Sequence, residues 1–217
     1  MKKLIILCVG LLFISAPSLA QDEENLTDEE KAYRDSIAAL NEESETMAKA
    51  RELFNEGNAL FESKKYDQAI AKFGESIKTD PEFVEAYYNK GVAEIESKKF
   101  SAAILTLTAY IAKEPNGKGY FQRAMANQEA GKITAAEKDY EKAKELDPDN
   151  EKIPYNFGVM KFMQNDFEGA LEEFNAAIET KPDFAFAWND KGSCYRQMGQ
   201  YAEAVKAYEE AEKRNPK

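Results

Sequence analysis

Histidine is absent from the 217-residue chain, and cysteine occurs only twice, as Cys8 and Cys194. Because histidine is the commonest general base and metal ligand, Ser-His-Asp sites, Cys-His sites and histidine-bound metals are excluded. Two cysteines are too few for a disulfide framework. No glycine-rich phosphate loop is present either. The sequence therefore predicts no cofactor, no metal site and no enzymatic activity.

Basic residues are also in short supply. The chain has 29 Lys and Arg against 40 Asp and Glu, a net charge of −11. Nucleic-acid binding rests on basic side chains that neutralise phosphates, so this balance argues against a nucleic-acid partner. The carboxylates recur with lysines three or four residues away, as on the solvated face of ordinary helices, which argues against a catalytic carboxylate pair. Cys194 is predicted to be a small buried packing residue, with a redox thiol as the alternative.

Long hydrophobic runs are missing except near the N-terminus, where residues 4–14 are apolar. Two lysines precede this run, and the small residues Ser18 and Ala20 follow it. This order is typical of a secretory signal peptide, residues 1–20, with cleavage between Ala20 and Gln21. The run is too short to span a membrane, which takes about 20 apolar residues. We expect an exported protein, periplasmic or otherwise secreted, with no transmembrane segment in the mature chain.

Residues 21–47 form an acidic segment with ten acidic and two basic side chains. Thr27 and Glu30 match a helix-capping box. Three apolar residues share one helical face: Tyr33, Ile37 and Leu40. We predict one helix here, followed by a hinge in the stretch NEESET. The sequence leaves open whether this helix packs on the domain that follows, residues 48–217, or stays mobile.

Residues 50–217 repeat with a period of 33 or 34 residues, which is set by five prolines: Pro81, Pro115, Pro148, Pro182 and Pro216. A glycine or alanine stands twenty-four residues before each proline, an alanine twelve before it, and a Phe, Leu or Tyr eight before it. Small residues let two helices approach closely, and proline ends a helix. Each unit is therefore predicted to be two antiparallel helices. A single unit cannot bury its apolar face alone, so the units must stack.

The pattern resembles the tetratricopeptide repeat family. The family signature appears almost whole in the last unit: Trp188, Gly192, Tyr195, Ala204, Tyr208, Ala211 and Pro216. The resemblance implies an all-α fold, a right-handed superhelical α-solenoid of five helix-turn-helix units. The units, numbered one to five, are 50–83, 84–116, 117–150, 151–184 and 185–217.

Units three and four depart from the pattern at their joint. Pro154 replaces a large residue in unit four, and proline is tolerated only in the first turn of a helix, so that helix should start late, near Ile153. In the second helix of unit three, Glu137 and Lys144 stand where the other units mostly have Ile, Leu or Val. These two charges either pair across the joint or leave it wet, and we expect a wet, exposed joint.

The resemblance also implies a binding surface. In this family the first helix of each unit lines a concave face, and the fifth residue of the unit is the central lining position. That position and its neighbours four and seven residues further on give the predicted groove: Phe54, Asn58, Phe61, Tyr88, Val92, Ile95, Phe121, Met125, Tyr155, Val159, Phe162 and Asn189. In the same register lie Gln128, Ser193 and Arg196. The basic residues with which some family members clamp a partner's terminal carboxylate are missing there.

Four successive aromatics at the fifth position either bind a partner or pack between helices. An exposed strip of aromatic side chains usually marks a binding site. The sequence thus favours a non-enzymatic scaffold that binds a protein or peptide segment in an aromatic groove. The alternative is a structural subunit that self-assembles or docks in a cell-envelope complex through its ends and its acidic N-terminal segment. The sequence does not determine the oligomeric state, although a monomer is favoured.

Overall fold

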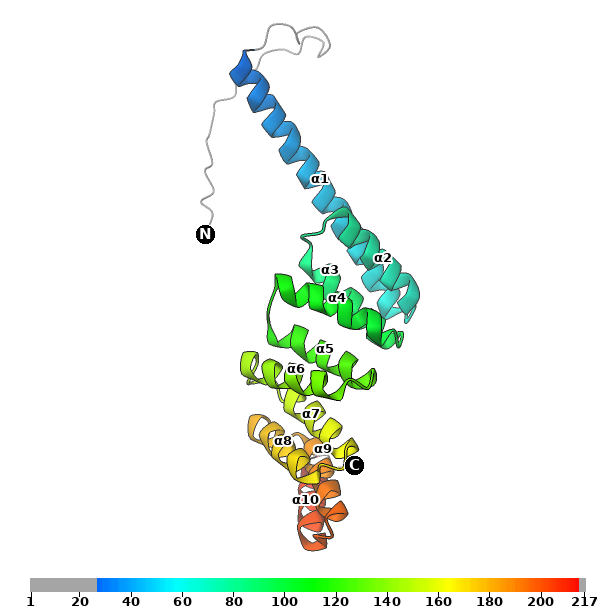
Figure 1. Ribbon diagram of the computed structural model, residues 1–217, viewed down its shortest axis with the longest axis vertical. Helices are drawn as coiled ribbons and strands as arrows, with labels where there is room; N and C mark the ends of the chain where they lie inside the picture. The colour runs from blue at the N-terminus through cyan, green and yellow to red at the C-terminus, as the bar shows by residue number, and fades with distance from the viewer. Residues whose placement is uncertain (1–26, 215–217) are drawn as a thin grey trace. The chain divides into compact units, whose positions relative to one another are not determined.

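The computed structural model describes residues 27–214, and Figure 1 shows them as a succession of helices. The predicted signal peptide and its cleavage site at Ala20 and Gln21 lie outside the described residues. Residues 27–214 contain no β-strand, so the predicted all-α class is confirmed. None of the helices in this range is long and apolar enough to cross a membrane. The helices are α1 (Asp28–Glu62), α2 (Tyr66–Thr79), α3 (Val84–Glu96), α4 (Phe100–Lys113), α5 (Gly117–Glu129), α6 (Ile133–Leu146), α7 (Lys152–Met163), α8 (Phe167–Thr180), α9 (Ala185–Gln197) and α10 (Tyr201–Arg214).

Helix α1 begins with the predicted capping box and continues without a break into the first repeat. The Thr27 backbone N–H donates to Glu30 Oε2 at 2.9 Å, and the Glu30 N–H donates to Thr27 Oγ1 at 3.3 Å. The stretch NEESET, which was predicted to be a hinge, is helical. Glutamate is a good helix former, and the stretch has no proline or glycine to end the helix. The chain nevertheless divides into two compact parts within this stretch, one ending at Glu45 and the other beginning at Thr46.

Within each repeat, the small residue of the first helix lies against the large residue of the second. A Cβ atom added at Gly91 would stand 2.6 Å from Leu107 Cγ, and one added at Gly158 would stand 2.8 Å from Phe174 Cε1. These separations leave no room for a side chain, so the close approach requires glycine. The alanine of the second helix is buried in every repeat: Ala69, Ala103, Ala136, Ala170 and Ala204. The predicted helix-turn-helix unit is therefore confirmed.

The joint between units three and four is drier than expected. Tyr140 of α6 stacks on Phe157 of α7 with ring centroids 5.2 Å apart, and both belong to one hydrophobic cluster that spans the joint. Lys144 Nζ pairs with Glu173 of α8 at 2.7 Å, so one of the two unusual charges pairs across the joint. The expectation of a wet joint is wrong, because two large rings fill the space where the backbones of α6 and α7 approach less closely than at other joints.

Helix α7 starts late, as predicted from Pro154. It begins at Lys152, one residue before the predicted start, and this places Pro154 in its first turn. A proline there lacks only an N–H that would have no partner within the helix. Pro154 is also buried, so it takes part in the packing of unit four.

Candidate functional site

The predicted groove residues all lie on the first helices of their units, but they are not equally accessible. Phe121 is buried, with 9% of its surface exposed, whereas Asn189 is exposed. The other ten are half-buried: Phe54, Asn58, Phe61, Tyr88, Val92, Ile95, Met125, Tyr155, Val159 and Phe162. Most of the aromatics among them pack against the buried clusters of their own units. Most of the predicted groove residues therefore pack against their own unit with one side and face the surface with the other.

Two aromatics at the fifth position are packed against the phenylalanine that ends their own unit, directly before the next helix begins. The ring centroids of Phe54 and Phe83 lie 5.0 Å apart, and those of Tyr155 and Phe184 lie 4.9 Å apart. Phe83 and Phe184 each stand two residues after a proline, directly before the next helix begins. No sequence expectation covered these two residues, although the recurring stretches PEF and PDF signal them. The fifth-position aromatics of units one and four are thereby packed against the connection that leads into the following repeat.

A cavity of about 260 Å³ opens between the first helices of units four and five. It is lined by Val159 and Phe162 of α7, Phe174 of α8, and Asp190, Ser193, Arg196 and Gln197 of α9. Val159 and Phe162 belong to the predicted groove, and Ser193 and Arg196 share its register on α9. Phe174 is the large residue eight positions before Pro182, and it was not part of the predicted groove because it comes from a second helix. The structure brings together the unit-four and unit-five end of the predicted groove, while the residues from Phe54 to Phe121 do not line this cavity.

Asp190 gives the cavity a polar wall. The Tyr155 hydroxyl donates to Asp190 Oδ2 at 2.9 Å, and Asn189 Nδ2 donates to Oδ1 at 3.1 Å. Burial, with the nearby Asp190 carboxylate, raises the pKa of Tyr155 well above its usual value, so its hydroxyl remains a donor at neutral pH. Arg196 is exposed, and no side chain of the described residues forms an ion pair with it. The cavity thus has an apolar floor, the hydrogen-bonded carboxylate of Asp190, and the exposed guanidinium of Arg196.

Cys194 lies on the core-facing side of α9 and not in the cavity. It is fully buried in one cluster with Ala170 and Phe174. Burial raises the pKa of its thiol to about 12, so the thiol is protonated at neutral pH. A protonated and shielded thiol is a poor nucleophile, which favours the packing role over the redox role. The described part of the chain also contains no group of three His, Cys, Asp or Glu side chains placed to hold a metal ion.

This architecture, a stack of paired helices, defines an α-solenoid of helix-turn-helix repeats, a class of proteins that mediate protein–protein interactions. Two segments, residues 117–150 and 185–217, match sequence models of the tetratricopeptide repeat. A third, residues 57–94, matches a model of the TPR repeat. The chain belongs to the tetratricopeptide repeat family.

Solved structures with the same fold include MamA and YrrB. A crystal structure of the MamA protein matches with a TM-score of 0.69 at 23% identity, over 79% of this chain and 92% of that chain. The structure of YrrB, described as a TPR protein with an unusual peptide-binding site, matches with a TM-score of 0.62 at 19% identity, over 85% of this chain and 93% of that chain. Identities this low show a shared fold and nothing more.

Two curated relatives are longer chains, and this chain matches part of each. The DnaJ homolog subfamily C member 7 homolog of Dictyostelium discoideum is 31% identical over 67% of this chain and 27% of its own length. RNA polymerase II-associated protein 3 of Mus musculus is 30% identical over 83% of this chain and 30% of its own length. The chain therefore spans less than a third of the length of these relatives.

Proposed function

We propose that this chain is a non-enzymatic adaptor that binds a segment of a partner protein along the first helices of its repeats. The cavity between α7 and α9 is the anchoring point. It carries this proposal because two residues of the predicted groove, Val159 and Phe162, line it together with Arg196, whose guanidinium has no ion-pair partner among the described residues. Its volume of about 260 Å³ lies below the range of about 300–1,000 Å³ typical of small-molecule sites, and suits one or two side chains of a polypeptide. The peptide-binding site ascribed to YrrB supports the same use of the fold.

The lining favours an apolar side chain with an acidic neighbour. Val159, Phe162 and Phe174 form the apolar floor, and burial of a leucine or phenylalanine side chain contributes about 1.5–3 kcal/mol. Arg196 at the rim is free to pair with a carboxylate of the partner. Asp190 repels a carboxylate placed inside the cavity. The acidic group is therefore expected beside the apolar residue and not in its place.

Immobilised peptides test this anchor. Short peptides that differ only in one dipeptide, Leu-Glu, Phe-Glu, Ala-Glu or Leu-Lys, are probed with the purified mature chain. We expect the strongest binding to the Leu-Glu and Phe-Glu peptides. Phe162→Ala should weaken that binding by about tenfold or more, as expected for an interface anchor. Arg196→Glu should remove the preference for the acidic residue.

Phe186→Ala is the matched control for the anchor. Phe186 lies on α9 outside the cavity lining and is 66% exposed, so its truncation removes a similar ring without touching the cavity. Equal weakening by Phe162→Ala and Phe186→Ala would contradict the proposal. So would unchanged peptide binding by a Phe162→Ala variant that melts at the wild-type temperature.

We also propose that the protein acts after export, in the periplasm or outside the cell. The support is the order of charge, apolar run and small residues in positions 1–20. The intact mass of the protein recovered from expressing cells is the test. The expected mass corresponds to a chain that begins at Gln21, and a mass that includes residues 1–20 would contradict export through this signal.

A further inference from the structure

The turns between the two helices of units one, two and three carry a row of lysines that form a lysine edge: Lys64, Lys65, Lys98, Lys99 and Lys132. All five are exposed. In units four and five the matching positions hold uncharged or acidic residues: Asn165, Asp166, Gly199 and Gln200. Positive charge therefore gathers on one edge of the first three repeats, in a chain whose net charge is −11.

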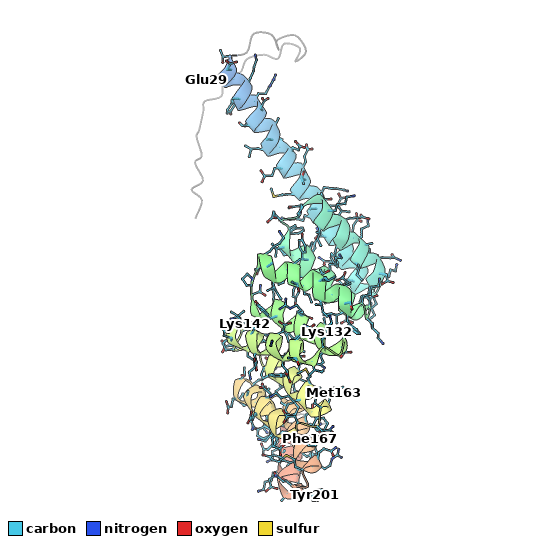
Figure 2. The ribbon with its side chains drawn as sticks, in the orientation of Figure 1. Glu29, Lys132, Lys142, Met163, Phe167 and Tyr201 are labelled. Carbon is cyan, nitrogen blue, oxygen red and sulfur yellow. The ribbon has the colours of Figure 1, made fainter. Side chains whose placement is uncertain are left out.

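The three turns lie side by side. Ser97 Oγ donates to Asp67 Oδ1 at 2.5 Å, and Lys99 Nζ pairs with the same oxygen at 3.0 Å, which ties the second turn to the start of α2. Ile95 and Ala126, which come just before the second and third turns, share one hydrophobic cluster. Figure 1 shows the turns following one another along one side of the repeats, and Figure 2 labels Lys132 on that side. The lysines thus form one continuous edge.

Two of the lysines occupy a backbone conformation that suits glycine better. Lys64 and Lys98 have φ of 58°, and the corresponding turns of units three and five use Gly131 at 72° and Gly199 at 75°. A residue with a side chain is disfavoured in this left-handed region. Strained positions of this kind tend to persist where they serve function. Both lysines therefore occupy turn positions that a side chain disfavours.

The lysine edge is only partly neutralised. Lys99 pairs with Asp67, whereas the ammonium groups of the other four have no ion-pair or hydrogen-bond partner among the described side chains. Two hollows adjoin the edge, one of about 290 Å³ that includes Tyr66 and one of about 510 Å³ that includes Ile104 and Tyr120. The edge therefore suits an acidic partner that also carries apolar side chains.

This chain itself contains a segment with that chemistry. The described residues 27–45 hold seven acidic and two basic side chains. On one face of this part of α1, Tyr33 is 70% exposed, Ile37 is 40% exposed and Leu40 is 59% exposed. An anionic bilayer would match the charge of the lysine edge, but its headgroups offer no apolar side chain for the hollows.

We propose that the lysine edge binds the acidic N-terminal helix, residues 28–45, of a second copy of this chain. Carboxylates of that helix pair with the lysines, and its apolar face enters the hollow beside Tyr120. At physiological ionic strength the screening length is about 8 Å, so the like net charges of two copies are largely screened while charges in contact still attract. The edge does not share a residue with the cavity between α7 and α9, so the same molecule can bind a partner segment there.

Sedimentation velocity of the full mature chain over a concentration series tests the proposal. We expect association that strengthens with concentration and weakens when salt is raised from about 150 mM to about 500 mM. The edge variant Lys64→Glu/Lys98→Glu/Lys132→Glu should lower the association constant by about tenfold or more, since each exposed charge contact is worth a few-fold. The matched control Lys78→Glu/Lys152→Glu/Lys206→Glu changes the net charge by the same amount at exposed lysines outside the edge, and should associate as the wild type does.

A charge swap identifies the occupant. The helix variant Glu42→Lys/Glu43→Lys/Glu45→Lys should also lose association, and its combination with the edge variant should regain it. A wild-type chain that stays monomeric at every concentration overturns the proposal, as does equal loss in the edge variant and its matched control, or a combined variant that does not recover. Binding of the wild type to vesicles with anionic phosphatidylglycerol, lost in the edge variant while self-association is unchanged, would assign the edge to a lipid surface instead.

Discussion

Unit three and unit four place an aromatic ring at the same repeat position, yet the two rings have different surroundings. Phe121 is buried and packs in one cluster with Tyr140, the ring that continues into the joint with unit four. Tyr155 is half-buried, donates its hydroxyl to Asp190 and lies beside the cavity. The difference arises on the neighbouring helices. In unit three, the large side chains of Tyr140 and Phe157 belong to the same buried cluster as Phe121. In unit four, the facing helix α9 has the smaller polar residues Asp190 and Ser193 beside the cavity.

The position of a residue within its repeat therefore predicts the helix and the helix face on which it lies, but not whether its side chain is accessible. The same holds at the turns. Lys98 and Gly199 occupy matching turn positions with similar backbone geometry, yet only the first three repeats carry the charge. Each repeat in a stack contacts only its neighbours, so a local change of residue type alters one surface without disturbing the array. In this way one fold presents an apolar cavity at one place and a cationic edge at another.

The largest expected effect is the loss of stability when Phe121, rather than Tyr155, is replaced by alanine. Phe121→Ala should lower the free energy of unfolding by about 3–5 kcal/mol, the range for a buried aromatic ring. Tyr155→Ala should lower it by less, because the Tyr155 ring is only half-buried. Denaturant unfolding of both variants, followed by circular dichroism, measures the two losses. Equal losses would show that Phe121 and Tyr155 are equivalent packing residues and would contradict the difference drawn between units three and four.

A smaller effect is expected at the ion pair that crosses the joint of units three and four. The Glu173 side chain is only 9% exposed, so Lys144→Met leaves a buried carboxylate without its cation and should destabilise the chain by about 1–3 kcal/mol. The double variant Lys144→Met/Glu173→Leu should recover most of that loss, because the uncompensated charge is gone. Amide hydrogen exchange across residues 140–160 should report the same order. A double variant that is as unstable as the single one would contradict the buried-charge explanation.

The smallest effect concerns Cys194. Near neutral pH, the free energy of unfolding should not change through titration of the Cys194 thiol. Because burial raises the pKa of its thiol to about 12, against about 8.5 for an exposed cysteine, the fold favours the protonated form. Its contribution is fully kept below about pH 8.5 and is lost as the pH rises above that value. Reaction with a thiol reagent at neutral pH should be slow in the folded chain and fast after denaturation. Rapid labelling of the folded chain would show that Cys194 is accessible and restore the redox interpretation.

Much of the fold could be predicted because the signals are local. The proline spacing, the small residue and the alanine of each unit report contacts within one helix pair, and these contacts set the positions of α2 to α10. The capping box at Thr27 and Glu30 and the late start of α7 at Pro154 are equally local. The polar stretch NEESET contains the boundary between the two compact parts, but it is helical because nothing in it ends a helix.

The candidate site was less predictable because it depends on side chains from different repeats. The groove register located Val159 and Phe162, but the cavity also needs Phe174 from the second helix of unit four and Asp190 from unit five. The burial of Phe121 depends on Tyr140, and the dry joint depends on the reach of Phe157. None of these pairings has a fixed spacing in the chain.

The sequence by itself determined the number of repeats, their helical character, the absence of histidine chemistry and the acidic balance. Each of these follows from composition or from contacts inside a single repeat. Only the tertiary structure decided which groove aromatics remain accessible, where the cavity opens and how the turn lysines line up. Those features are set by how neighbouring repeats stack, and stacking brings together residues whose separation along the chain differs from one site to the next.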